Sequence, residues 1–120
     1  MAIKYRIIPR RNYLHVKASG VDESLEEVAR YAQAVIRYAE RYRSARILCD
    51  ERELEYRNST FDSYQMAESL SNASPTIRKA STVCKSGALQ PEILQRPMFL
   101  KRGVQLKVTT DMDEAINWLS

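Results

Sequence analysis

The sequence predicts an α/β domain built on a mixed β-sheet of about five strands, with about four helices. Runs in which apolar and polar residues alternate with a period of two are followed by segments whose apolar residues recur at helical spacing. The two kinds of segment then alternate along the chain, which is typical of parallel strands joined by crossover helices. The chain has 120 residues and only three Gly and four Pro, so residues 1–120 are expected to form one domain without a long linker.

The chain opens with two extended runs, at 3–8 and 12–18. In the second run Leu14, Val16 and Ala18 alternate with polar residues, a pattern typical of a half-buried strand. The gap between the runs is short and polar, so we expect an antiparallel hairpin, followed by a mostly parallel sheet.

A long amphipathic helix is expected over 23–42. Ser24 and Glu27 form a capping box, and apolar residues follow at helical spacing on one side. The short apolar run 46–50 comes next. A strand that follows a helix that follows a strand indicates a right-handed crossover and parallel pairing.

The region after this strand is expected to be an irregular charged segment over 51–58, leading into a second helix. Ser59 or Thr60 can cap that helix, and the residues up to Pro75 stop it.

The second half of the chain is expected to hold two further strands, at 77–84 and 104–109. Between them we expect a third helix over roughly 91–100, although Pro97 would break or kink it. Asp111 is expected to cap a final helix that carries Trp118 and Leu119.

The charge pattern argues against a nucleic-acid binder. The formal charge is +4, but residues 1–60 carry 12 Lys/Arg and 9 Asp/Glu, and residues 61–120 carry 7 and 6. Neither half holds the clustered positive charge that a phosphate backbone requires. No apolar run approaches the roughly 18 residues of a membrane span, and the first residues lack a signal-peptide pattern. We therefore expect a cytoplasmic protein that binds no nucleic acid and does not cross a membrane.

The sequence offers no metal or cofactor motif. Cys49 and Cys84 are too few for a structural zinc site, and His15 is the only histidine. Gly-rich phosphate loops and Cys-x-x-Cys motifs are also missing from the sequence. We expect both cysteines to be reduced thiols in the core, and we expect no cofactor.

Three charged residues form the first candidate ligand or partner site. Asp50, Glu51 and Arg52 follow the strand 46–50, and open α/β sheets bind ligands beyond the carboxyl ends of their strands. Two interpretations remain open here: a small enzyme that uses Asp50 and Glu51 as acid and base, or a solvated loop whose charges pair with one another.

Aromatic and basic residues on the long helix form a candidate interface. Tyr and Arg are enriched in protein interfaces, and the residues concerned are Tyr31, Tyr38, Tyr42 and Arg37. Alternatively, the rings cover the edge of the core. Together with the edge of the opening hairpin, this helix leads us to expect a weak homodimer.

Three stretches resemble the SpoIIAA-like family, whose small domains have the STAS-type fold. Residues 101–119 are similar to the close of those domains, with an Arg-Gly pair, an alternating strand, an acidic cap and a helix ending in Trp-Leu. The run 45–50 resembles their central strand, and 13–20 resembles their second strand and the turn after it. The resemblance implies a STAS-like fold for this chain.

The resemblance also implies a candidate phosphorylation site. Anti-sigma-factor antagonists of this family carry an Asp-Ser-Ser/Thr-Gly loop whose Ser or Thr is phosphorylated. The corresponding residues here are Ser59 and Thr60, but the flanking Asp and the Gly are absent. These two residues are thus candidates either for a phospho-switch or for a helix cap.

Taken together, we expect a binding or regulatory module without catalytic activity. It would act through contact with a protein partner or by holding a small apolar or anionic ligand. A small enzyme built on Asp50 and Glu51, and a phospho-switched regulator using Ser59 or Thr60, are the alternatives.

Overall fold

The protein was analysed as a computed structural model, which describes residues 3–22, 24–56, 76–85, 98–99 and 105–120. Its elements are β1 (Ile3–Pro9), β2 (Leu14–Asp22), α1 (Leu25–Arg41), β3 (Arg46–Tyr56), β4 (Lys79–Val83), β5 (Met98–Phe99), β6 (Gln105–Thr109) and α4 (Met112–Leu119). The second helix expected after Ser59 or Thr60 lies outside the described residues, and so does the third helix expected over 91–100, apart from residues 98–99.

The strands form one mixed sheet in the order β1-β2-β3-β4-β6-β5. The opening hairpin is antiparallel, with Ile3 opposite Gly20 and Pro9 opposite Leu14. The pairs β2–β3, β3–β4 and β4–β6 are parallel, and the short β5 is antiparallel to β6. The expected hairpin followed by mostly parallel pairing is therefore confirmed.

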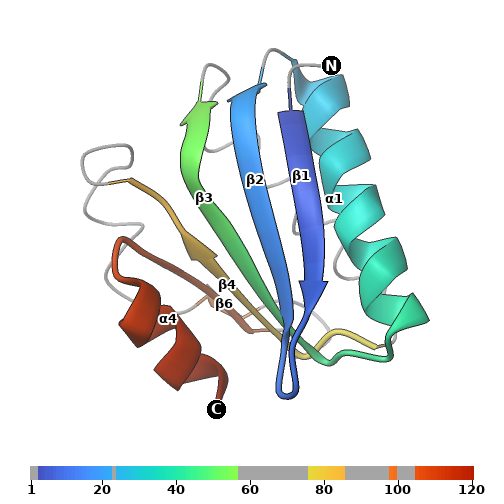
Figure 1. Ribbon diagram of the computed structural model, residues 1–120, viewed down its shortest axis with the longest axis vertical. Helices are drawn as coiled ribbons and strands as arrows, with labels where there is room; N and C mark the ends of the chain where they lie inside the picture. The colour runs from blue at the N-terminus through green and yellow to red at the C-terminus, as the bar shows by residue number, and fades with distance from the viewer. Residues whose placement is uncertain (1–2, 23, 57–75, 86–97, 100–104) are drawn as a thin grey trace.

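Helices α1 and α4 lie on opposite faces of the sheet (Figure 1). α1 begins where Ser24 accepts a hydrogen bond from the Glu27 N–H at 3.2 Å, as the capping box predicts. Its apolar side packs on β1 and β2 and closes the larger core, in which Leu14, Val16 and Ile47 are almost fully buried.

On the other face, α4 packs on β3, β4 and β6 and closes a smaller core. This core is centred on Leu48, Val83, Ala115 and Leu119. Asp111 caps the helix by accepting hydrogen bonds from two N–H groups of its first turn. The expected final strand and helix are thereby confirmed.

The segment 51–58, expected to be irregular, is instead largely strand. β3 continues to Tyr56 because β2 also extends beyond its expected end, to Asp22, and offers its backbone for pairing. Hydrogen bonding along a neighbouring strand outweighs the poor strand preference of a charged segment. The alternating glutamates that indicated a loop are therefore side chains of a strand.

One extra residue in β3 forms a bulge at the centre of this pairing. Lys17 lies opposite Asp50, and Ser19 lies opposite Glu53, so two steps along β2 match three along β3. Because side chains alternate between faces, one extra residue reverses the faces beyond it. Leu54 is consequently returned to the α1 face, where it is 3% exposed in the larger core.

Residues 98–99 differ from the expected third helix over 91–100. They form the short strand β5, with Met98 opposite Leu106 and Phe99 opposite Gln105. The backbone of β6 offers a partner for this pairing, as β2 does for β3. The sheet therefore gains a sixth strand at its edge.

Candidate functional site

The bulge in β3 holds a buried carboxylate against an arginine. Asp50 is only 4% exposed, and it accepts hydrogen bonds from Arg52 Nε to Oδ1 and from Nη2 to Oδ2, both at 2.9 Å. The Arg52 backbone N–H also donates to Oδ1, at 3.2 Å. One residue thus supplies three hydrogen bonds, two of them in the bidentate geometry that makes arginine–carboxylate pairs strong.

This pairing sets the charge of Asp50. Burial alone would raise its pKa, but the side-chain and backbone hydrogen bonds from Arg52 outweigh burial and lower the pKa. The carboxylate is therefore ionised and has both oxygens engaged. A group in that state is a poor proton acceptor near neutral pH.

His15 lies on the same face of the sheet, one strand away. Neither of its ring nitrogens has a hydrogen-bond partner within the described ranges, and both are buried. Burial and the nearby Arg10 lower its pKa, although Asp50 acts in the opposite direction. The imidazole is therefore neutral at pH 7. The ring of Tyr13, the residue just before β2, is its neighbour, with the ring centroids 6.2 Å apart.

Glu51 faces the other side of the sheet from Asp50. The Glu51 carboxylate and the Cys49 thiol both raise the pKa of Tyr31, a residue of α1, after the larger effect of burial. Burial likewise raises the pKa of Cys49 to about 12. Asp50 and Glu51 are therefore not a pair of carboxylates sharing one site, as an acid–base mechanism would need.

The candidate interface on α1 divides into buried and exposed residues. Tyr31 is 8% exposed and belongs to the larger core, where its ring packs on Tyr5. Tyr38 is partly buried, whereas Tyr42 is 48% exposed and Arg37 is exposed. The Tyr38 and Tyr42 rings are stacked, with centroids 6.5 Å apart and planes 16° apart.

Ser59 and Thr60 lie outside the described residues.

Cys84 is buried and Cys49 partly buried, and both are free thiols. Within the described ranges no three His, Cys, Asp or Glu side chains come together as a metal site.

The structure also gathers basic residues that no sequence motif connects. Arg10 and Arg11 in the β1–β2 turn share one surface hollow with Arg43 and Arg46, more than 30 residues later. The backbone at Arg43 is also unusual, because this non-glycine residue has a positive φ of 51° just after the end of α1.

Neither a family model nor a curated protein matches this sequence. Solved structures do match. An anti-sigma factor antagonist from Mycobacterium paratuberculosis superposes with a TM-score of 0.65 over 98% of this chain and 93% of its own, at 14% identity. An uncharacterized protein from the DUF3478 family with a SpoIIAA-like fold, from Shewanella loihica, superposes with a TM-score of 0.52 over 99% and 94%, at 16% identity.

This chain has the SpoIIAA-like fold. At such low identity the likeness concerns the fold, and the SpoIIAA-like fold carries no conclusion about the site residues by itself. The resemblance of the sequence to SpoIIAA-like domains is thus confirmed at the level of architecture. In the described part of this SpoIIAA-like chain, no helix is both long and apolar enough to cross a bilayer.

Proposed function

We propose that this SpoIIAA-like chain is a regulatory binding module that acts by contact with a protein partner and has no catalytic activity of its own. Its fold is that of an anti-sigma factor antagonist, a name that describes regulation through binding. Regulation through binding is also the simplest mode of action for a chain whose candidate catalytic residues, Asp50 and Glu51, lie on opposite faces of the sheet.

The observation that carries this proposal is the exposed end of α1. Tyr42 presents 48% of its surface to solvent while its ring is stacked on Tyr38, which is itself held by the larger core. A tyrosine fixed in this way loses little conformational freedom on binding. With the exposed Arg37 on the same helix, it offers the aromatic and guanidinium groups that dominate binding energy in interfaces. The partner is expected to present an acidic surface.

The enzyme alternative is disfavoured by the state of Asp50. Both carboxylate oxygens accept hydrogen bonds from Arg52, and the pKa is lowered. Glu51 faces Tyr31 on the other side of the sheet. A general base needs a pKa near the working pH and access to substrate. Asp50 has a lowered pKa and is buried, and Glu51 faces the other side of the sheet, so the two cannot act as a pair.

Affinity purification from the native cell tests the proposal. The wild-type chain is compared with Tyr42→Ser and Arg37→Glu, and with matched controls Tyr5→Ser, another exposed tyrosine, and Arg30→Ala, an exposed arginine nearer the start of α1. We expect one partner with wild type and both controls, and at least about tenfold less of it with the two test variants, as for interface hot spots.

Two outcomes would overturn the proposal. One is an identical set of captured proteins for all five chains, each of which must first show the wild-type circular dichroism spectrum. The other is turnover of a substrate that disappears in an Asp50→Ala variant. Light scattering of the pure protein tells whether the partner is a second copy, the weak homodimer expected from the sequence. Phosphate on Ser59 or Thr60 in protein from its own cell would add a switch to the same function.

A further inference from the structure

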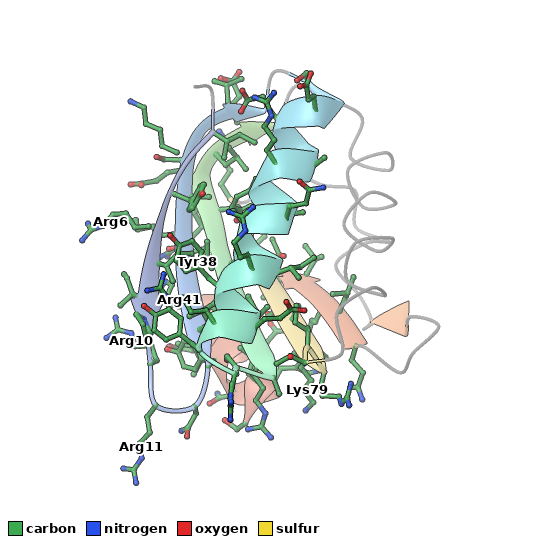
Figure 2. All side chains as sticks on the ribbon, turned by 90° about the vertical axis from the view of Figure 1, so that its right-hand side faces the viewer. Arg6, Arg10, Arg11, Tyr38, Arg41 and Lys79 are labelled. Atoms are coloured by element: carbon green, nitrogen blue, oxygen red, sulfur yellow. The ribbon has the colours of Figure 1, made fainter. Side chains whose placement is uncertain are left out.

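An arginine-lined hollow lies at the end of the molecule where the β1–β2 turn meets the end of α1. Its volume is about 470 Å³. Figure 2 shows Arg10 and Arg11 projecting from the hairpin at the end where α1 also ends. Arg43, in the segment that joins α1 to β3, Arg46, the first residue of β3, and Tyr42 also line the hollow. We call the hollow lined by Arg10, Arg11, Arg43 and Arg46 the arginine hollow.

The charge of the arginine hollow is one-sided. Four arginine residues line it, and no Asp or Glu of the described residues does so. Like charges brought together on a surface repel one another, so a bound anion is favoured both by its own attraction to the arginines and by relief of this repulsion. The planar guanidinium also matches the oxygens of phosphate-type groups in a bidentate manner.

The backbone that presents Arg43 is fixed in an unfavourable conformation. The Ser44 N–H donates to the Ala39 carbonyl at 2.8 Å, and the Arg43 N–H donates to the Glu40 carbonyl at 3.1 Å. These are the two bonds of a Schellman motif, and Arg43 occupies the left-handed position where glycine is the usual residue. Arginine at this position destabilises the fold relative to glycine, which points to a role for its side chain outside the fold.

Two further contacts hold the hollow in shape. The Ser44 hydroxyl donates to the Arg46 carbonyl at 2.7 Å, which ties the segment after α1 to the start of β3. The Arg10 N–H donates to the Tyr13 carbonyl at 3.0 Å, which closes the turn of the hairpin. The arginines therefore extend from backbone that is already ordered, so binding costs less conformational entropy.

We infer that the arginine hollow binds a small polyanion whose charge is carried by two or more phosphate-type oxyanion groups. The volume is that of a small-molecule site, within the usual range of about 300–1,000 Å³. Four arginines suit more than one oxyanion group, because a single phosphate offers too few oxygens to engage all of them. The hollow shares Tyr42 with the α1 contact surface proposed above, but the two are tested with different variants, Arg10 and Arg43 for the anion and Tyr42 and Arg37 for the protein partner, so either can fail without the other.

Isothermal titration calorimetry with inorganic tripolyphosphate tests the inference. We expect one ligand per chain for wild type and binding about tenfold weaker for Arg10→Ala and for Arg43→Gly, the loss of one charge-assisted contact. Arg30→Ala removes the same charge from an exposed position about 20 Å away along α1, and we expect it to bind within twofold of wild type.

Arg43→Gly separates loss of a ligand contact from loss of the fold. Because glycine relieves the left-handed strain, we expect this variant to have a higher Tm, by roughly 2–4 °C, while it binds the anion more weakly. A variant that is more stable and binds less well cannot owe its weaker binding to misfolding.

The single histidine gives a second, independent signal. Arg10 is among the groups that lower the pKa of His15, so an anion bound beside Arg10 should raise that pKa. Titration followed by NMR of the imidazole should show the increase on adding tripolyphosphate to wild type. In Arg10→Ala the increase should be much smaller.

Three results would overturn the inference. They are no measurable heat with tripolyphosphate at millimolar concentration, equal binding by wild type and Arg43→Gly, or a single-stranded RNA that binds more tightly than tripolyphosphate over a stretch longer than the hollow. The last result would assign the arginines to a nucleic-acid surface.

Discussion

Removal of Leu119 should destabilise the fold more than removal of the much larger Trp118. Leu119 is 1% exposed at the centre of the smaller core, whereas Trp118 is partly buried at its margin, beneath Lys79. Trp118→Ala would cost roughly 3–5 kcal/mol on the condition that its ring is buried. The structure does not meet that condition, because the helix turns Leu119 and Ala115 into the core.

The magnitudes follow from burial. Leu119→Ala removes three buried carbon atoms, worth about 2.4 kcal/mol of transfer free energy, and the cavity that remains brings the loss to about 3 kcal/mol. Trp118→Ala should cost about 1–2 kcal/mol, because the ring is only partly buried at the margin of the smaller core and the contact with Lys79, 5.2 Å above the ring centroid, is weak when exposed. The Lys79 bond to the Trp118 carbonyl, at 3.2 Å, survives the substitution.

Urea denaturation followed by far-UV circular dichroism is the suitable assay, since Trp118 is the only tryptophan and fluorescence cannot follow its loss. With a slope of about 1.5 kcal/mol/M, Leu119→Ala should lower the midpoint by about 2 M. Asn117→Ala, at an exposed position of α4, is the matched control and should change stability by less than about 0.5 kcal/mol. A larger loss for Trp118→Ala than for Leu119→Ala would refute this account of the smaller core.

Three further predictions concern titratable groups. Because Arg52 lowers the pKa of Asp50, the stability that Asp50 supplies is present above its unfolded pKa of about 3.9 and lost as pH falls through the lowered pKa. Asp50→Asn should therefore be less stable than wild type at pH 7, and the two urea midpoints should converge once the pH is below the lowered pKa. Because the pKa of His15 is lowered in the folded state, the unfolded chain takes up a proton at a higher pH than the folded chain does. Wild type should therefore lose stability as pH falls below 6.5, and His15→Phe should lose less. Parallel curves of urea midpoint against pH would contradict this. Since burial raises the pKa of Cys49 to about 12 and also raises that of Cys84, iodoacetamide at pH 8 should label neither thiol until urea unfolds the chain, as mass spectrometry can check.

Much of the architecture follows from local patterns that depend only on neighbouring residues. The capping box at Ser24, the alternation of β2 and β6, and the acidic cap at Asp111 each determine backbone conformation within a few residues, and the structure contains all of them. The order of elements then leaves a hairpin followed by right-handed crossovers as the simplest topology, and the sheet order agrees.

Asp50, Arg52 and Tyr42 could be named as candidates from the sequence alone. Which residues surround them could be learned only from the fold. The length of β3 depends on the backbone that β2 offers as a partner, and the bulge beside Asp50 decides which side chains face which layer. Tyr42 stays exposed because α1 ends beside it.

What the sequence determined by itself is therefore the order of strands and helices, because alternation and capping act between residues close in the chain. Which charges meet depends on how the folded chain brings distant segments together. Arg10 and Arg43 are 33 residues apart and share no motif, and they line one hollow because the hairpin turn and the end of α1 reach the same end of the sheet. Such a meeting depends on how α1 packs across β1 and β2, a matter of long-range apolar burial rather than of local pattern.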